Sequence, residues 1–574
     1  MKKKINTKNN VNMNRKAVIF IELLVLFLTL GSSIVMTATG SSETNKATEP
    51  VLAPVNPDFV EYQEGKIYVQ FKASVNEHKR GFIPAPVDLN YLSKISTAKI
   101  SAPAYYDLRA LNKVTSVKDQ GEEGVCWTFA TYGSLESYLM PGENRDFSEN
   151  NMKNLLSSAC PEGFDLNPND GGNTFMSTAY LARWSGPVDE TADPYSIYSL
   201  ESPQDLPVQK HVQNILFIPD RKSSLDNNEI KSAIMQYGAI FTSIYFDDAY
   251  YSPDRYSHYY NGPSTSDHAV SIVGWDDKFS RDNFSSIPPG DGALIVKNSW
   301  GSDWGDGGYF YVSYYDSNIG TNNAVFTAET TENYKNIYQY DPLGWTESAG
   351  YDNPTAWCAN IFTAKTSEAL EAVSFYAADS NCNYEIYVYI DPESGPVSQK
   401  NPVFSKSGTI GTAGYHTVPL GSEVQLEAGQ KFSVVLKFTT PNCIYPVAIE
   451  MPLEGFSSKA TANPGESFVS EDGSIWEDIN EYSPNTNVCI KAFTDSGSIN
   501  VLKVFPGYTN PPTDPDKDSL YEDINGNGML DFDDVVAYYD NMEWIEENVP
   551  IESFDYNKNG LIDFDDVVKL YDML

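Results

Sequence analysis

Basic residues are scarce in this chain of 574 residues. It has 39 lysines and arginines against 78 aspartates and glutamates, a formal net charge of -39 at pH 7. A protein that binds nucleic acid needs clustered lysine and arginine to neutralise the phosphates. The composition therefore argues against a nucleic-acid partner. We expect the acidity to serve solubility and to supply calcium ligands instead.

Cysteine and histidine are also few, with six cysteines and five histidines. No CxxC pair or paired histidines accompany them, which disfavours a zinc site. Four of the cysteines lie between residues 358 and 489, so two disulfides are expected there, with three pairings open. The members of this group are Cys358, Cys382, Cys443 and Cys489. Cys160 is left without an obvious partner in its own segment.

Only one long apolar run is present, at residues 17–36, and Glu22 is the only charged residue in it. It follows a basic stretch and precedes Ala38-Thr39-Gly40, which is typical of an export signal over residues 1–40. An uncleaved anchor is the alternative, because twenty apolar residues can span a bilayer. Both interpretations predict an extracellular protein, secreted or associated with the cell surface.

A cysteine motif stands near residue 126. Gln120 precedes Cys126 by six residues, and Cys126 opens an amphipathic run that predicts a helix over 126–139. The positive end of a helix favours a thiolate, although a lone cysteine there is often only a small buried residue. His268 follows 142 residues later and Asn298 another 30 residues later. Cysteine, histidine and asparagine in this order and at this spacing are a thiol-peptidase signature.

Residues from about 104 to 328 resemble papain-like cysteine peptidases. The resemblance is carried by Tyr106-Asp107-Leu108-Arg109, the block at 120–130, Gly171-Gly172 and the block at 298–305. It implies a catalytic domain over residues 101–332 with a helical lobe that carries Cys126 and a β-rich lobe that carries His268 and Asn298. Short β-rich runs at 239–244, 269–275, 293–297 and 308–314 and a helix over 149–158 agree with two unlike lobes.

The resemblance also implies the roles of the site residues on a protein or peptide substrate. Cys126 attacks the scissile carbonyl, His268 carries the proton, Asn298 orients the imidazole, and Gln120 forms the oxyanion hole with the backbone N–H of Cys126. Gly171, Gly172 and Trp300 are assigned to substrate binding, with Trp300 expected to cover the His268–Asn298 hydrogen bond. No cofactor is expected for catalysis. Two alternatives stay open: a non-catalytic adhesion protein on a peptidase scaffold, and acyl transfer to an amine.

Residues 41–100 correspond to the pro-segment, which in the family covers the cleft until it is removed. They contain a strand-like run at 66–71 but no long charged helical pattern, so inhibition is an open question. The mature chain is expected to begin near residues 101–105. Glu123 replaces a disulfide cysteine of many relatives, and Glu122-Glu123 would disfavour acidic substrates. The polar insertion at 278–290 is interpreted as a surface excursion, with a loop over the cleft as the alternative.

Residues 333–496 are predicted to form a β-sandwich. Tyr384, Ile386, Val388 and Ile390 share one face of a strand with period two, which is typical of a sandwich strand. The segment resembles the lectin-like domain behind the peptidase in some exported microbial papain homologues. Glycan binding through Trp345, Trp357 or Trp476 is one expectation, and a core position for these tryptophans is the alternative.

A proline-rich linker at 497–517 leads to an internal repeat at 518–574. The repeat contains two calcium loops, 523–534 and 555–566, each with oxygen ligands, a glycine at position six and aspartate at position twelve. Two structural Ca²⁺ ions are predicted, and their ligands are Asp523, Asn525, Asn527, Met529, Asp531 and Asp534 in the first loop and Asp555, Asn557, Asn559, Leu561, Asp563 and Asp566 in the second.

Each loop runs into a helix-like stretch, 535–542 or 567–574. Loop–helix repeats of this kind resemble a dockerin, whose partner is the cohesin domain of a scaffold protein, with a calcium-stabilised cap as the alternative. The near-identical faces predict two docking orientations, a hypothesis that changing Phe532 and Asp533 would test. The predicted fold class is thus α+β: a two-lobed papain-like domain, a β-sandwich and a small all-α calcium-binding dockerin.

Overall fold

The computed structural model describes residues 49–65, 79–94, 101–393, 395–495, 503–515 and 520–574. The predicted export signal at 1–40 and the strand-like run at 66–71 lie outside the described residues. Within the described ranges, none of the helices combines the length and the apolar character that crossing a bilayer requires.

Three helices form the first lobe. They are α2 (Cys126–Leu139), α3 (Glu149–Leu155) and α4 (Thr174–Ala182). Ser148 caps α3 and Asn173 caps α4, because each side chain accepts a hydrogen bond from a backbone N–H of the first turn. α3 ends three residues before the predicted end. The bounds of α2 are those predicted, but its predicted amphipathic character is wrong, because residues 126–137 are buried on every side.

The reason for this burial is the position of α2 in the molecule. It packs against α3 and α4 within its own lobe and against strands β4 (Ile240–Ile244), β7 (His268–Asp276) and β10 (Thr321–Glu329) of the second lobe. A helix with neighbours on all sides has no face exposed to solvent, so its sequence does not need a polar face.

The second lobe is an antiparallel sheet, and its predicted strands are confirmed. β4 pairs with β7, β7 with β8 (Ala293–Lys297), and β8 with β9 (Tyr309–Ser313). The remaining elements of this half are β2 (Tyr105–Asp107), β3 (His211–Ile218), α5 (Asn228–Tyr237), β5 (Tyr251–Ser252) and β6 (Ser257–His258). The insertion at 278–290 packs Phe279 and Phe284 against Tyr259 and Tyr311, as a surface excursion would.

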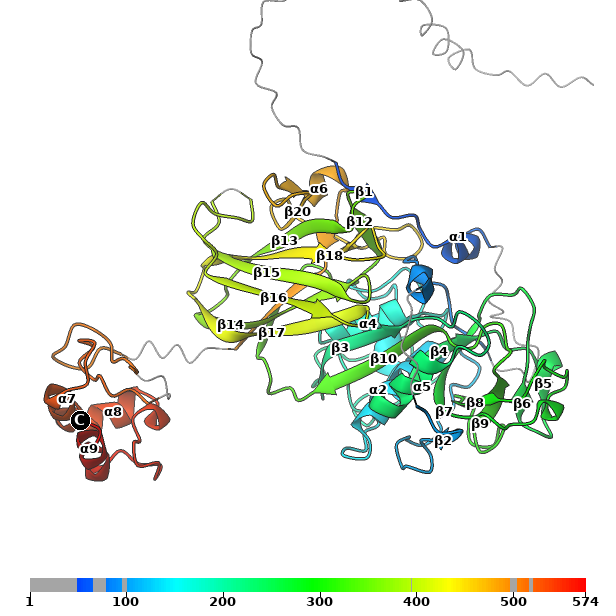
Figure 1. The fold of residues 1–574 in the computed structure, drawn as a ribbon, viewed down its shortest axis with the longest axis horizontal. Helices are drawn as coiled ribbons and strands as arrows, with labels where there is room; N and C mark the ends of the chain where they lie inside the picture. The colour runs from blue at the N-terminus through cyan, green and yellow to red at the C-terminus, as the bar shows by residue number, and fades with distance from the viewer. Residues whose placement is uncertain (1–48, 66–78, 95–100, 394, 496–502, 516–519) are drawn as a thin grey trace, which may run out of the picture. The chain divides into compact units, whose positions relative to one another are not determined.

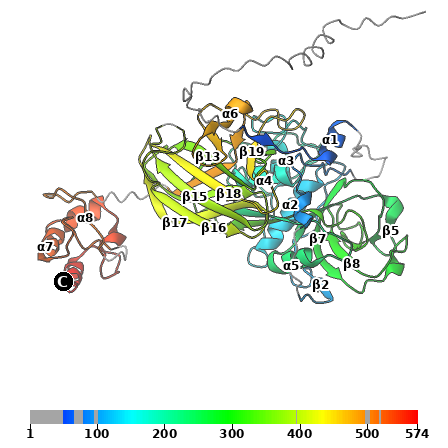
Figure 2. The same ribbon diagram turned by 45° about the horizontal axis from the view of Figure 1, so that its top comes forward.

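Two sheets with an apolar core between them form most of the third part of the chain (Figures 1 and 2), and β12, β19 and β22 belong to a smaller third sheet. One sheet has the order β16-β15-β18-β13-β20-β21, and the other runs through β11, β23, β14 and β17. Tyr384, Ile386 and Val388 of β15 are buried, and Glu385 and Tyr387 between them are half-buried, as the period of two predicts. The strand bounds are β11 (Asn336–Tyr338), β12 (Glu347–Gly350), β13 (Thr355–Thr363), β14 (Glu368–Ala377), β15 (Cys382–Ile390), β16 (Phe404–Ile410), β17 (Gly414–Leu426), β18 (Lys431–Thr439), β19 (Val447–Glu450), β20 (Ser467–Ser470), β21 (Glu477–Asp478), β22 (Asn487–Val488) and β23 (Ile490–Asp495), with the short helix α6 (Ile479–Tyr482).

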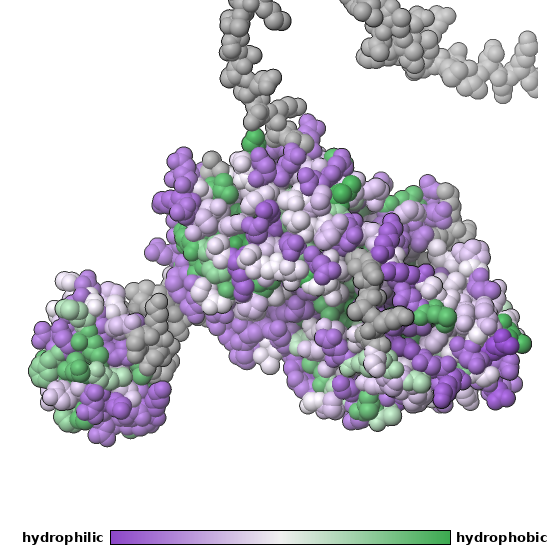
Figure 3. All heavy atoms as spheres, in the orientation of Figure 1, coloured by the Kyte–Doolittle hydropathy of each residue, from purple (hydrophilic) through white to green (hydrophobic). Residues whose placement is uncertain are grey.

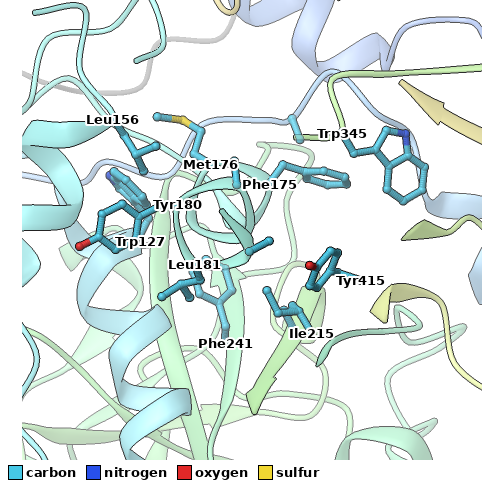
Figure 4. Close-up of a cluster of buried hydrophobic side chains, with 14 of the residues drawn as sticks. Trp127, Leu156, Phe175, Met176, Tyr180, Leu181, Ile215, Phe241, Trp345 and Tyr415 are labelled. Carbon is cyan, nitrogen blue, oxygen red and sulfur yellow. The ribbon is translucent and has the colours of Figure 1, made fainter. Parts of the chain in front are cut away.

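The β-sandwich shares a sheet with the second lobe and an apolar core with the helical lobe. β17 pairs with β3 over Gly414–His416, so a continuous ladder of hydrogen bonds crosses from one part to the other. Beside this junction, Trp345 packs edge-on against Phe175 of α4 at 5.6 Å between ring centroids, and Tyr376 lies 5.4 Å from the same indole (Figure 4). Trp345 is only 1% exposed.

That burial corrects one expectation about glycan binding. Trp345 is a core residue and cannot stack on a sugar from solvent. Trp357 and Trp476 are half-buried, and Trp357 stacks on Tyr387 at 5.8 Å. Glycan binding at Trp357 or Trp476 stays a prediction.

The expected disulfides are absent. All six cysteines lie within the described residues, and all six are free. Cys358 on β13 and Cys382 on β15 have β18 between them. Strands two positions apart are separated by about 9.6 Å, beyond the reach of a disulfide. Cys443 and Cys489 belong to a different apolar cluster, where they pack as small buried side chains.

The C-terminal repeat contains α7 (Phe532–Asp540), α8 (Met542–Asn548) and α9 (Phe564–Tyr571) around a core that includes Ile524, Tyr538 and Leu570. α7 and α9 begin three residues before the predicted starts. The reason is a capping box at each: Asp531 with Asp534, and Asp563 with Asp566. α8 was not predicted from the sequence.

Candidate active site

Cys126, His268 and Asn298 meet where the two lobes face each other. Cys126 is the first residue of α2, and its Sγ accepts a hydrogen bond of 3.2 Å from the backbone N–H of Ala269. His268 begins β7, and Asn298 follows β8, the strand paired with β7. His268 Nε2 and Asn298 Oδ1 lie 2.8 Å apart. Because Nε2 donates to the amide oxygen, Nδ1 is the ring nitrogen that can exchange a proton with the thiol.

Trp300 covers this pair. Its indole stacks on the imidazole of His268 at 4.7 Å with an interplanar angle of 21°, and only 5% of the residue is exposed. Phe246 meets the indole edge-on at 4.8 Å. The ring therefore shields the His268–Asn298 hydrogen bond from water, which is the covering role expected for it. The assignment of Trp300 to substrate binding stays a prediction. Exclusion of water strengthens a hydrogen bond inside a protein.

The amide of Gln120 is held in one orientation. Its Oε1 accepts a hydrogen bond of 2.6 Å from Ser299 Oγ, so Nε2 is the end that points into the cleft. There Nε2 donates to the carbonyl oxygen of Lys79 at 3.0 Å and to that of Glu123 at 2.7 Å. A donor fixed in this way and already in contact with a carbonyl oxygen is what an oxyanion hole requires.

Residues 79–84 occupy the cleft. The backbone of Gly172 donates to Gly81 O at 2.9 Å and accepts from Ile83 N–H at 3.1 Å, and Phe82 N–H donates to Asp267 O at 3.0 Å. The pairing of Phe82 with Gly172 is parallel. Gly172 thus binds an extended chain through its backbone, and a Cβ at Gly171 would lie 2.9 Å from Gly81 O. Substrate binding by the two glycines stays a prediction. A Cβ at residue 172 would lie 2.4 Å from the indole of Trp127, so only glycine fits.

Gly81 lies directly over the nucleophile. A Cβ at this residue would lie 2.0 Å from Gly124 O, so a side chain larger than that of glycine would clash here. Burial raises the pKa of the Cys126 thiol to about 12, although backbone N–H groups of Ala269 and Gly81 oppose the rise. The thiol is therefore neutral in this form of the protein. The carbonyl oxygen at the oxyanion donor belongs to Lys79, and the N–H of Gly81 lies at Sγ.

Two basic side chains of the same segment meet acidic residues of the cleft. Arg80 Nη1 lies 3.3 Å from Asp267 Oδ2, and Lys79 Nζ lies 3.4 Å from Glu123 Oε2. Burial raises the pKa of Asp267 to about 6, and the positive charge of Arg80 opposes this rise. The resemblance implied that residues 41–100 form a pro-segment over the cleft. Which residues enter the cleft could not be predicted from the sequence, because an extended segment carries no periodic pattern.

The β-sandwich holds the rest of the N-terminal segment. β1 (Val51–Leu52) adds to the edge of β12, Phe59 of α1 (Pro57–Gln63) packs on Phe456 at 5.3 Å, and Tyr91 donates a hydrogen bond to Ala378 O. The residues on both sides of the segment in the cleft thus contact the β-sandwich.

A buried charged cluster behind the site was missed on the sequence. Lys118 Nζ contacts Glu149 at 2.9 Å and Glu136 at 3.4 Å, and Lys297 donates to Thr115, which in turn donates to Glu136. Burial raises the pKa of Glu149 to about 8 and lowers the pKa of Lys297. The cluster joins α2 to the residue before Asn298, so it fixes the two lobes at the site.

The predicted calcium loops are folded for a cation. In each loop, the first and last aspartates accept backbone hydrogen bonds from loop residues: Asp523 and Asp534 from Asn525, Asn527, Gly528 and Asp531, and Asp555 and Asp566 from Asn557, Asn559, Gly560 and Asp563. Burial and the neighbouring carboxylates raise the pKa of Asp534 and of Asp566. Asn557 Nδ2 is buried without a hydrogen-bond partner in the described residues.

These observations fit Ca²⁺, which prefers carboxylate, amide and backbone oxygens. Met529 and Leu561 stand at position seven, where the backbone carbonyl is the ligand. In the part of the chain that the structure describes, no group of three or more His, Cys, Asp and Glu side chains could hold a metal ion, so the loops depend on asparagine and backbone oxygens as well.

Family models match two parts of the chain. Residues 102–329 match the papain family cysteine protease model, and residues 337–494 match the lectin like domain model. A digestive cysteine proteinase 2 of Homarus americanus is 30% identical over 248 residues, which are 42% of this chain and 70% of that protein. A cysteine protease of Blomia tropicalis is 27% identical over 232 residues, and the chain spans slightly less than two thirds of it, 65%.

One solved structure extends the similarity beyond the peptidase part. It contains the cysteine protease and lectin-like domains of Cwp84, a surface layer associated protein of Clostridium difficile. The TM-score is 0.67 at 27% identity, with 79% of this chain and 100% of that chain covered. The structure of Cwp84 after propeptide cleavage gives a TM-score of 0.61 at 28% identity, covering 68% of this chain and 99% of the other. This chain belongs to the papain family of cysteine proteases and carries a lectin-like domain behind the peptidase domain.

Proposed function

We propose that the protein is an exported cysteine endopeptidase that is made in a latent form. The observation that carries this proposal is the arrangement of Cys126 at a helix start, His268 hydrogen-bonded to Asn298, and a Gln120 amide already bound to a carbonyl oxygen in the cleft. Each group has the position that its role in acyl transfer needs.

The reaction follows from these positions. The thiol proton passes to His268 as Sγ attacks the carbonyl carbon, and the charge that develops on the carbonyl oxygen is stabilised by Gln120 Nε2 and the N–H of Cys126. The adduct collapses to a thioester, and His268 gives its proton to the leaving amine. His268 then deprotonates a water molecule that cleaves the thioester, which releases the acid and restores Cys126.

Latency is supported by the segment in the cleft. Residues 79–84 occupy the cleft, and Cys126 is 0% exposed, so neither water nor a substrate reaches the thiol in this form. Departure of this segment would rehydrate the thiol and thereby lower its pKa, because burial is what raises it. The neighbouring structure described after propeptide cleavage belongs to Cwp84. We propose the same event for this chain.

The test is hydrolysis of a mixed fluorogenic peptide library by the secreted full chain under reducing conditions, with N-terminal sequencing to establish processing. Cys126→Ala should abolish turnover, a loss of at least roughly 10⁴-fold. Cys160→Ala is the matched control, because Cys160 is the other free cysteine of the catalytic part and lies away from the three residues. Equal turnover in Cys126→Ala and in the unchanged protein would overturn the proposal.

We also propose that residues 518–574 are a calcium-dependent dockerin that binds a cohesin domain. A duplicated apolar surface supports this: Phe532 and Phe564 are each 59% exposed, and Tyr539 and Tyr571 are each 56% exposed. The rings pair reciprocally, Phe532 with Tyr571 at 6.3 Å and Tyr539 with Phe564 at 6.1 Å. Apolar residues gather on the visible face of this segment in Figure 3. Exposed patches of this kind mark protein interfaces.

Pull-down with a panel of cohesin domains, with Ca²⁺ and with EDTA, tests the docking. The two-orientation hypothesis predicts that Phe532→Ala and Phe564→Ala each retain binding while the double variant loses it. Loss of binding in Phe532→Ala alone, with the second loop folded, would exclude it. Docking on a scaffold, together with the predicted export signal, supports an extracellular or cell-surface location.

A further inference from the structure

The segment in the cleft marks the pocket beside the scissile bond. Gln120 Nε2 donates to Lys79 O, so the carbonyl of Lys79 occupies the place where the attacked carbonyl of a substrate is stabilised. The side chain of this same residue is directed to Glu123, with 3.4 Å between Nζ and Oε2. Lys79 therefore indicates what the pocket next to the oxyanion donor accepts.

Glu123 is built into the wall of the cleft. It lies on the loop between Gln120 and Cys126, and its carbonyl is hydrogen-bonded to the Gln120 amide at 2.7 Å. Its side chain is 18% exposed, and that of Lys79 is 29% exposed, so the pair is partly desolvated. The loop that carries Glu123 joins the oxyanion donor Gln120 to the nucleophile Cys126. The Glu123 carboxylate therefore lies beside the reacting carbonyl for a substrate that runs along the cleft in either direction.

The surrounding charges leave Glu123 available to a cation. The charge of Glu123 also acts on Lys153, but Lys153 Nζ is already bound to Asn154 Oδ1 and Asn169 Oδ1 at 3.2 Å and to Ser199 O. Asp170, adjacent on the opposite wall, accepts from Asn167 at 2.6 Å. Within the described residues, Lys79 is the one cation found within 4.0 Å of the Glu123 carboxylate. Departure of the segment leaves a carboxylate in the cleft with that cation removed.

We propose that Glu123 selects lysine or arginine as the residue whose carbonyl is attacked, the P1 residue of the substrate. The protein is then a peptidase for basic sites, and Glu123 is its specificity-determining residue. This inference rests on the proposed peptidase function and names its substrate class. A charged hydrogen bond in a partly desolvated site discriminates against a neutral side chain by roughly tenfold or more.

The test compares two internally quenched peptides that differ only at P1, with lysine or norleucine, which has an apolar stem and no charge. The processed full chain should cleave the lysine peptide with a kcat/KM about tenfold higher. Glu123→Gln should bring the ratio near one, and Glu123→Lys should favour a P1 glutamate peptide. Glu122→Gln is the matched control, because Glu122 is exposed and should keep the original ratio. A ratio near one in the unchanged protein, or one that Glu123→Gln leaves intact, overturns the proposal.

A second measurement does not depend on turnover. In the full chain carrying Cys126→Ala, amide hydrogen exchange at Phe82 and Ile83 reports opening of the segment from the cleft. Lys79→Met and Glu123→Gln should each speed this exchange several-fold, and the double variant should add nothing further. Exchange that is unchanged by either substitution, or additive in the double variant, rejects Glu123 as a lysine-binding group. Absence of all Cys126-dependent turnover would instead reject the proposed function, and the exchange result would stand on its own.

Discussion

At the residue scale, Asp267 serves two elements at once. Its Oδ1 accepts the N–H of Phe246, which positions the β-lobe beside His268, and its Oδ2 pairs with Arg80 of the N-terminal segment. Arg80 also lies over the ring of Phe246, at 5.7 Å. The ionisation of this one carboxyl group therefore contributes to the hold of the segment on the cleft, beside the backbone bonds to Gly172 and the Lys79–Glu123 pair.

This arrangement predicts a pH-dependent latency. Burial raises the pKa of Asp267 from 3.8 to about 6 in the folded protein. The carboxylate that pairs with Arg80 is then present above pH 6 and is lost as pH falls through 6. Because burial under the segment is what raises this pKa, the closed form binds the proton more tightly than the open, rehydrated form, so falling pH stabilises the closed form. We expect the segment to open several-fold less readily at pH 5 than at pH 7, measured as amide exchange at Phe82 in the Cys126→Ala chain and corrected for the intrinsic pH dependence of exchange.

Arg80→Met provides the control for that experiment. It removes the partner charge, so its opening should be faster at pH 7, and the slowing of opening between pH 7 and pH 5 should be larger, because the positive charge of Arg80 no longer opposes the rise in the pKa of Asp267. An unchanged pH profile in this variant would show that another titrating group controls the segment.

At the element scale, most of the peptidase part follows from local sequence. The runs at 240–244, 268–276 and 293–297 alternate or are wholly apolar and end at turn residues, so their strands could be predicted. Cys126, His268, Asn298 and Gln120 could be found because motif order constrained them. What failed depends on distant partners. β1 pairs with β12 some three hundred residues away, and the burial of α2 and of Trp345 comes from other parts of the chain.

Trp345 gives a prediction about the junction between α4 and the sandwich. Trp345→Ala should lower the free energy of unfolding by about 3–5 kcal/mol, because it removes a fully buried indole from a close-packed core. Differential scanning calorimetry would show the fall in melting temperature. Peptide turnover should fall with it, since α4 begins just after Gly172.

Trp476→Ala is the comparison for this variant. Trp476 is half-buried and donates its indole N–H to Gly473 O, so its loss should lower the free energy of unfolding by roughly 1 kcal/mol. Equal destabilisation by the two substitutions would argue against a shared core at Trp345.

At the scale of the whole molecule, we expect catalysis and calcium binding to use separate residues. The reaction as derived needs no metal, whereas each predicted calcium loop offers aspartate, asparagine and backbone oxygens. EDTA should therefore lower the melting temperature of residues 503–574 and leave peptide turnover unchanged. Saturating Ca²⁺ at a hundred times its Kd stabilises a site by about 2.7 kcal/mol.

Substitutions in the loops separate this effect from other consequences of EDTA. Asp523→Ala combined with Asp555→Ala should remove the calcium dependence of melting, while Asp540→Ala, at an exposed helix end, should keep it. A melting temperature that never responds to Ca²⁺ would contradict the proposed ions.

The ladder between β17 and β3 has a consequence for any attempt to divide the chain. A peptidase part expressed without residues 333–496 would turn β3 into an edge strand, with unpaired N–H and C=O groups at residues 214–216 and with Phe175 uncovered. Such an edge is a template for pairing with other chains, so the fragment should self-associate and aggregate. We therefore expect the two domains to be inherited together, because a gene recombination between them would break the β17–β3 ladder. A recombination beyond residue 496 would leave this ladder intact.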